Sequence, residues 1–232
     1  ADVIAKSKVV LGQAGRVAKT DDSTKGPPAR RSLAIRKLSK TAPDPKVFMP
    51  HFPYLTRNIP ELEQAAKRRG GHGIFSVSLS EGGVIRNVPA FFIHEDNYFP
   101  ALAIEMLRVA FNRSTLLVNV NDGGVAGIGI KKGVTIKTDR HGRIWPYYSK
   151  HDKDKYVSAA DVLAGTVDPA MIKGKLTILG TSAVGLRDIR TIPTESDIPG
   201  VEVHAQLIEA IVSGNYLTRP FYADAVELAF IL

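Results

Sequence analysis

Five side chains able to bind a polar ligand follow an apolar run late in the chain. They are Thr181, Ser182, Arg187, Asp188 and Arg190. The apolar run at residues 175–179 (KLTIL) is predicted to be a β-strand, which places these side chains in the loop beyond its carboxyl end. Ligands of α/β proteins usually bind in that position. This loop is the candidate ligand site, and a purely structural Asp188–Arg190 ion pair is the alternative interpretation.

Two glycines of the same loop, Gly180 and Gly185, suggest a phosphate-binding loop. Such a loop needs lysine and then serine or threonine after the second glycine, whereas Leu186 and Arg187 follow here. The sequence therefore excludes a nucleotide-hydrolysing loop and leaves open an anion site built from backbone N–H groups. The glycine-rich residues 123–129 lie between predicted strands, so they form a turn and a strand rather than a dinucleotide-binding motif.

No other residue pattern indicates catalysis or metal binding. The chain has no cysteine, which excludes disulfides, thiolate ligands and cysteine nucleophiles. Its histidines show neither helical i, i+4 pairing nor zinc-site spacing. The His94-Glu95-Asp96 run is typical of a solvent-facing loop, and His204 is typical of a hydrogen-bonded structural histidine on an apolar helix. We expect no catalytic residue, no metal and no cofactor.

The charge of the chain is concentrated near its N-terminus. The net charge is +8, and residues 16–46 hold nine Lys or Arg against three Asp. Such a stretch could contact nucleic acid or anionic lipid headgroups, but a solvated basic loop is the simpler interpretation. It contains no aromatic residue on which single-stranded nucleic acid could stack. We therefore expect no nucleic-acid partner.

The pattern of apolar residues, prolines and glycines predicts the elements that position the candidate site. Residues 1–13 are expected to be the end of a helix that leads into a short strand, so we expect the true start of the domain to lie upstream. Residues 15–60 hold seven of the fourteen prolines and are expected to be an irregular surface connection. The remaining expected elements are helices at 60–67, 101–111, 158–164, 201–213 and 221–232, a hairpin at 74–79 and 84–93, and a β-meander at 116–145. The expected fold is α/β, with a central mixed β-sheet flanked by helices and an antiparallel β-meander.

Several of these stretches resemble the second family of CHASE domains, the extracytoplasmic sensing modules of bacterial cyclases and kinases. The matching stretches are residues 156–165 (YVSAADVLAG), 174–193 (GKLTILGTSAVGLRDIRTIP), 199–214 (PGVEVHAQLIEAIVSG) and 217–220 (LTRP), together with 81–92, 99–110 and 138–148 upstream. The resemblance covers roughly the whole chain, and residues 180–204 are its most specific part. The basic residues 15–60 depart from it.

This resemblance implies a location and a role. Residues 1–220 would form a sensory domain on the periplasmic side of the cell membrane, and residues 221–232 would begin a juxtamembrane or transmembrane helix. The parent would be a membrane-bound adenylate or guanylate cyclase that acts as a homodimer and responds to an unknown small-molecule or protein signal. The family supplies no ligand-binding residues that can be carried over.

Other functions fit parts of the sequence. The output domain could belong to a histidine or serine/threonine kinase instead of a cyclase. A soluble α/β hydrolase-like enzyme is an alternative of another class, although no nucleophile or metal set supports it. A basic nucleic-acid binder and a pure dimerisation platform are two further alternatives.

Overall fold

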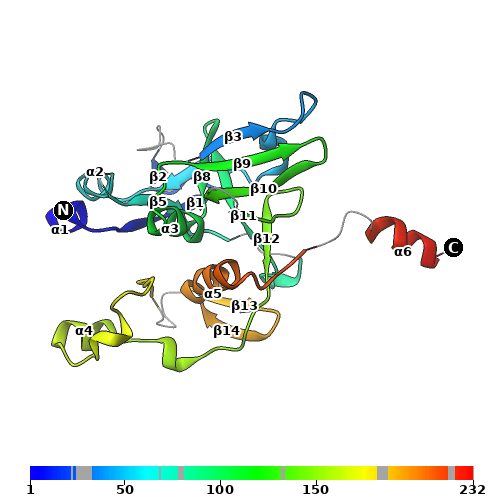
Figure 1. Cartoon of the computed structure of the whole chain (residues 1–232). Helices are drawn as coiled ribbons and strands as arrows, with labels where there is room; N and C mark the ends of the chain where they lie inside the picture. The colour runs from blue at the N-terminus through cyan, green and yellow to red at the C-terminus, as the bar shows by residue number, and fades with distance from the viewer. Residues whose placement is uncertain are drawn as a thin grey trace.

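The computed structural model describes residues 1–21, 23–24, 33–67, 69–77, 81–131, 134–181, 188–218 and 223–231. Within these ranges, Figure 1 shows sheets and short helices on one side of the long helix α5, with a hairpin and a looser excursion on its other side. The predicted α/β class is confirmed, including its mixed sheet, flanking helices and antiparallel meander. The strands are divided among several small sheets.

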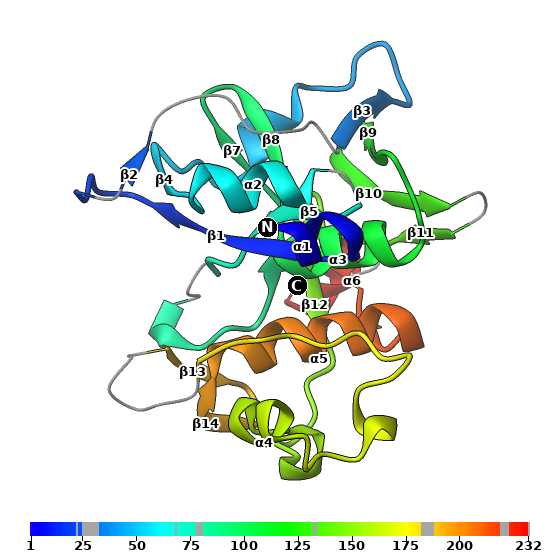
Figure 2. The same ribbon diagram turned by 90° about the vertical axis from the view of Figure 1, so that its left-hand side faces the viewer.

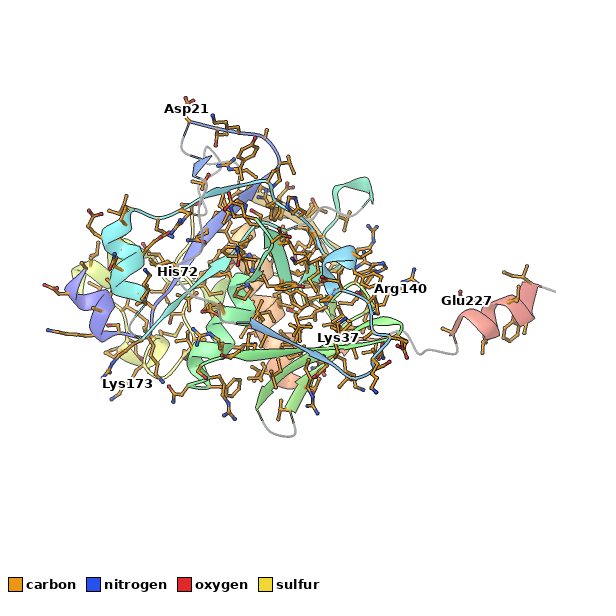
Figure 3. The ribbon with its side chains drawn as sticks, turned by 90° about the horizontal axis from the view of Figure 1, so that it is seen from above. Asp21, Lys37, His72, Arg140, Lys173 and Glu227 are labelled. Atoms are coloured by element: carbon orange, nitrogen blue, oxygen red, sulfur yellow. The ribbon has the colours of Figure 1, made fainter. Side chains whose placement is uncertain are left out.

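Helices form where the sequence provides local start and stop signals. The α-helices of the described residues are α1 (Asp2–Lys6), α2 (Pro60–Ala66), α3 (Leu102–Ala110), α4 (Ala159–Ala164), α5 (Gly200–Ser213) and α6 (Ala223–Ile231). Short 3-10 turns are η1 (Pro45–Phe48), η2 (Glu81–Gly83), η3 (Lys153–Lys155) and η4 (Pro169–Met171). Each helix predicted from the sequence is present: α6 is described over Ala223–Ile231, and the ends of the other four lie within one residue of the predicted bounds. The described residues of α6 lie apart from the rest, and Figure 3 places its Glu227 far from His72.

The first four-stranded sheet has the order β2-β4-β1-β5. Its strands are β1 (Val10–Arg16), β2 (Ser23–Thr24), β4 (Tyr54–Thr56) and β5 (Gly71–Ile74). Strand β1 pairs antiparallel with β4 and parallel with β5, so the sheet is mixed. The expected helix-then-strand opening of the chain is confirmed by α1 and β1.

The second four-stranded sheet has the order β11-β10-β9-β3. Its strands are β3 (Leu33–Lys37), β9 (Leu116–Asn121), β10 (Gly124–Lys131) and β11 (Val134–Ile136), and β3 lies parallel to β9. The predicted meander is confirmed for β9, β10 and β11. Residues 15–60 are less irregular than expected, because β3 and β4 each join a sheet. Strand β12 (Arg143–Pro146) leaves the meander and pairs with β6 (Val88–Pro89) and β15 (Tyr216–Leu217).

Two hairpins complete the fold. They are β7 (Phe91–His94) with β8 (Asn97–Pro100), and β13 (Ile189–Ile192) with β14 (Glu195–Pro199). The prediction of a hairpin between residues 74–79 and 84–93 was wrong. Residues 75–77 are not in a strand and residues 78–80 lie outside the described residues, while β7 turns back on β8 through Glu95 and Asp96, both at positive φ.

The predicted strand at residues 175–179 does not form. Residue 175 is a bend and residues 176–179 have no regular structure; among the described residues they pair with no strand, and only Ile178 packs against the core. High β-propensity indicates that a segment fits a sheet, but it does not supply a neighbouring strand.

The core that positions the candidate site is built around α3 and α5. Helix α3 packs against β5, where a Cβ on Gly73 would lie 2.6 Å from the Cα of Leu102. Helix α5 packs on α3, and its Val203 and Leu207 are fully buried. Helix α5 also contacts β12, β13 and β14. Helix α5 is therefore held between the main body and the C-terminal hairpin.

Candidate functional site

Helix α5 is the element that organises the candidate site. It begins after Pro199, which presets the backbone angle of a helix start, and it ends at Gly214 with φ 75°, the left-handed conformation that glycine adopts readily. Its buried apolar stripe includes Val203, Leu207 and Ala210, and Ile211 is partly buried beside them.

Both described ends of the predicted ligand loop lie at the first turn of α5. A Cβ on Gly180 would be 2.6 Å from the Val201 side chain, and one on Gly200 would be 2.4 Å from Oδ1 of Asp188. The N–H of Gly200 also donates to the carbonyl oxygen of Asp188 at 2.7 Å. Glycine is therefore required on each side, and the loop starts and finishes against the positive end of the helix dipole.

The structure pairs two of the five predicted site residues. Nη2 of Arg190 lies 3.0 Å from Oδ1 of Asp188, with about a third of each side chain exposed (33% and 35%). Thr181 is exposed. Ser182 and Arg187 lie outside the described residues, so the gathering of all five stays a prediction. The ion pair agrees with the structural alternative and leaves both charged groups reachable from solvent.

His204 lies one turn further along α5 and is buried. Its Nε2 is 2.9 Å from the carbonyl oxygen of Phe75, while Nδ1 is buried with no partner among the described residues. Burial lowers the pKa of His204, against the opposing effects of the Phe75 hydrogen bond and the charge of Asp188. The imidazole is therefore neutral at physiological pH, which agrees with its interpretation as a structural histidine.

The first half of α5 carries a second polar group that the sequence analysis missed. Oε2 of Glu202 accepts hydrogen bonds from Tyr156 Oη at 2.5 Å and His151 Nδ1 at 2.6 Å, and Oε1 accepts one from Gln206 at 2.9 Å. Burial acts to raise the pKa of Glu202, but these hydrogen bonds outweigh it and hold the pKa below its usual value. Burial raises the pKa of Tyr156, and the hydrogen bond to the Glu202 carboxylate raises it further. The cluster fastens residues 151–156 to α5.

Only part of that cluster was visible in the sequence. Glu202 and Gln206 are four residues apart on a helix that is otherwise apolar on this side, which indicates a shared polar partner. Nothing in the spacing points to residues some fifty positions earlier in the chain.

Removing the Tyr156 hydroxyl tests how much the hydrogen bonds of the Glu202 cluster contribute to the unfolding free energy. Tyr156→Phe deletes one charge-assisted hydrogen bond and keeps the ring that packs against His151 at 5.1 Å. Because the site is partly exposed, we expect a loss of about 0.5–1.5 kcal/mol in unfolding free energy by urea denaturation. Tyr147→Phe, at a tyrosine that is 70% exposed, is the control and should change stability very little. Equal losses in the two variants would contradict the role given to Glu202.

An apolar cavity of about 290 Å³ lies at the other end of α5. It is lined by Phe111, Ile130, Val134, Thr135, Ile136, Ile211, Val212 and Tyr216. The Tyr216 hydroxyl accepts a hydrogen bond from the backbone N–H of Lys137 at 3.3 Å. Helix α5 thus connects the predicted loop at its N-terminus with a hollow at its C-terminus.

The prediction that residues 94–96 face solvent is correct for two of these three residues. His94 is fully buried, with Nδ1 2.8 Å from the carbonyl oxygen of Phe52, so the prediction that it faces solvent was wrong. Its neighbours Glu95 and Asp96 are exposed, as expected. The described side chains include no group of three or more His, Asp or Glu that could hold a metal ion.

The described residues thus form a mixed α/β domain with polar side chains along one long helix, α5. Comparison with known families identifies it further. The model of the CHASE2 domain matches residues 1–232, so the chain belongs to the CHASE2 family, the extracytoplasmic sensory domains of signalling proteins. CHASE2 domains are sensory and not catalytic. Neither the curated proteins nor the solved structures gave a match. Among the described residues, no helix is both long and apolar enough to cross a bilayer.

Proposed function

We propose that this domain senses a small-molecule or protein signal on the periplasmic side for a membrane-bound adenylate or guanylate cyclase. The observation that supports this most is the family match over the whole chain. Residues 1–220 would form the sensor, and residues 221–232 would begin the helix that carries the signal to the membrane. The apolar side chains of Leu228, Phe230 and Ile231 on α6 are exposed, as the start of a membrane helix requires.

The parent protein tests this function directly. We expect the full-length gene product to fractionate with membranes and to convert ATP or GTP to a cyclic nucleotide. Autophosphorylation without cyclic nucleotide formation would replace the cyclase by the kinase alternative. A gene product that is not membrane-bound and has neither activity would overturn the proposal.

The signal would act at the loop of residues 181–190. This loop closes on the first turn of α5, and the Asp188–Arg190 pair is open to solvent on one side. A ligand that engages either partner more strongly in one arrangement of α5 shifts the population toward that arrangement. The opposite end of α5 leads through β15 toward α6, which gives the shift a route to the C-terminal segment.

Substitutions in this ion pair test the site. Cyclic nucleotide output of the full-length parent would be measured in cells held in fresh and in spent growth medium. We expect Asp188→Asn and Arg190→Gln each to change the ratio of the two outputs by about fivefold or more, which corresponds to loss of a typical allosteric coupling. Arg36→Gln, at an exposed arginine of β3, is the matched control and should leave the ratio unchanged.

Thermal melting separates loss of sensing from loss of folding. Because the pair is partly exposed, both variants should melt within a few degrees of the parental chain. An unchanged output ratio in both variants would remove the loop as the ligand site, whether or not the parent is a cyclase.

A further inference from the structure

The cavity of about 290 Å³ at the C-terminal end of α5 has an almost wholly apolar lining. Six of its eight lining residues have hydrocarbon side chains, and the other two are Thr135 and Tyr216. Figure 2 shows this end of α5 below β11, which supplies three of the lining residues. The exposed fractions of Phe111, Val134 and Val212 are 42%, 40% and 65%. Large apolar side chains exposed together around one hollow are typical of a binding site rather than of scattered surface residues.

The volume of the cavity limits what it can hold. An apolar cavity of about 150 Å³ in another protein binds benzene. A volume of about 290 Å³ therefore has room for two fused rings, or for an alkyl chain of roughly eight to ten carbons. A protein helix with its side chains is about 10–12 Å across, which is wider than a compact space of this volume. The volume thus favours a small molecule over a segment of another protein.

Two exposed cations lie next to the lining residues along the chain. Arg113 follows Phe111 by two residues, and Lys137 directly follows β11. Lys137 is also joined to the lining by its backbone N–H, which donates to the Tyr216 hydroxyl. Neither cation takes part in an ion pair among the described residues. Their positive charge is therefore free to attract an anion to this part of the surface.

The acids nearest to the lining along the chain do not cancel this charge. They are Asp139 and Glu209, and each is already in an ion pair, Asp139 with Arg143 at 2.7 Å and Glu209 with Lys155 at 2.8 Å. The unpaired charge beside the cavity is therefore positive, and a ligand with an anionic group complements it.

The Tyr216 hydroxyl can fix the position of that anionic group. It accepts the N–H of Lys137 at 3.3 Å, and a hydroxyl that accepts a hydrogen bond keeps its own proton to donate. Hydrogen bonds from a neutral donor to a carboxylate are stronger than those to a neutral acceptor. The lining thus combines an apolar space with one polar donor, the usual composition of a small-molecule site.

We propose that this cavity binds a small amphipathic carboxylate, with its rings or alkyl chain among the apolar side chains and its carboxylate at the Tyr216 hydroxyl. The site lies at the opposite end of α5 from the loop of residues 181–190. The inference does not rest on the proposed function, because binding is measured on this chain alone, without an output domain. A ligand here would contact both α5 and β15, the strand that precedes α6.

Two probes with the same rings and opposite head charges test the proposal by isothermal titration calorimetry of the 232-residue chain. They are 2-naphthoate and the 2-naphthylmethylammonium ion, both at low ionic strength. We expect 2-naphthoate to bind with a dissociation constant of about 1 mM or below, and about tenfold or more tighter than the cation. No detectable binding of 2-naphthoate at about 5 mM, or equal affinity for the two probes, would overturn the proposal.

A substitution that fills the cavity locates the bound rings. Val212→Trp adds bulk to the lining and should weaken 2-naphthoate binding about tenfold or more. Val17→Trp is the matched control, because Val17 is 78% exposed and outside the lining, and it should change the dissociation constant less than twofold. Both variants should melt within a few degrees of the parental chain, since both positions are exposed. Equal affinities in these two folded variants would place the probe elsewhere and contradict the site.

Substitutions of polar groups test how the carboxylate is held. Tyr216→Phe keeps the ring, so it should weaken 2-naphthoate about fivefold or more and leave the weaker binding of the cation unchanged. Arg113→Gln combined with Lys137→Gln should reduce the preference for 2-naphthoate over the cation. Lys40→Gln combined with Lys173→Gln, at two exposed lysines outside the lining, is the charge-matched control and should keep that preference. A preference that falls equally in both double variants would mean that only the net charge of the chain attracts the probe, which would overturn the site.

Discussion

Replacing Arg108 with methionine should cost about 3–5 kcal/mol of unfolding free energy, the largest loss expected from a single substitution in this chain. Arg108 and Glu105 form a fully buried pair on α3, with Nε–Oε2 and Nη2–Oε1 distances of 2.8 and 2.7 Å. The guanidinium also donates to the backbone carbonyls of Gly70 and Arg113. Methionine fills much of the same volume but leaves the Glu105 carboxylate buried without a partner.

Urea denaturation followed by circular dichroism measures this loss. Arg140→Met is the matched control, since Arg140 is exposed, and it should change stability by less than about 0.5 kcal/mol. The double variant Glu105→Gln with Arg108→Met removes the unpaired buried charge of Glu105 and should recover part of the lost unfolding free energy. A single variant that loses less than about 1 kcal/mol would show that the pair is not buried as described.

The sequence predicted those elements whose signals are local. Ser158 caps α4 by accepting from the N–H of Ala160, and Gly165 ends it at φ 72°. Asp168 caps η4 in the same way, and Gly214 ends α5. Each of these signals acts within four residues along the chain, so its effect does not depend on what the rest of the protein does.

Elements that depend on distant contacts were misplaced. Residues 74–79 were predicted to pair with residues 84–93, but the strand there is β5, which pairs with β1 and lies so close to α3 that Gly71 and Gly73 have no room for a side chain. A Cβ on Gly71 would be 1.9 Å from Oε1 of Glu105. The KLTIL segment shows the opposite error, since its strong strand pattern finds no neighbouring strand among the described residues. β-propensity is a property of one segment, whereas a sheet forms only where a second strand lies beside it.

The predictions for the candidate site show the same difference between local and long-range contacts. Asp188 and Arg190 are two residues apart, and their ion pair was anticipated as an alternative. The Glu202 cluster joins α5 to His151 and Tyr156, which are 51 and 46 positions away, and this pairing follows from the fold rather than from the spacing. The sequence therefore indicated the Asp188–Arg190 pair before α5 but not the hydrogen bonds that hold the first half of that helix.

Stability should fall as the pH is lowered from 7.5 to 5, and His204 should account for a distinct part of the fall. Its folded-state pKa lies below the ordinary value of 6.5, since burial disfavours the charged imidazolium. Below pH 6.5 the unfolded chain takes up a proton that the folded chain refuses, so the unfolding free energy decreases. The decrease is at most about 1.4 kcal/mol per pH unit for one such group, or about 2 kcal/mol at pH 5.

His204→Gln isolates this contribution. Glutamine can still donate to the carbonyl oxygen of Phe75 but does not titrate, so its curve of unfolding free energy against pH should be flatter by up to that amount. Other groups with lowered pKa values, such as His72, act equally in both proteins and cancel in the comparison. The Glu202 carboxylate titrates below its ordinary value of 4.5, outside this range. Parallel curves would mean that the imidazole is protonated in the folded chain, which requires a partner for Nδ1 that α5 and its described neighbours do not provide.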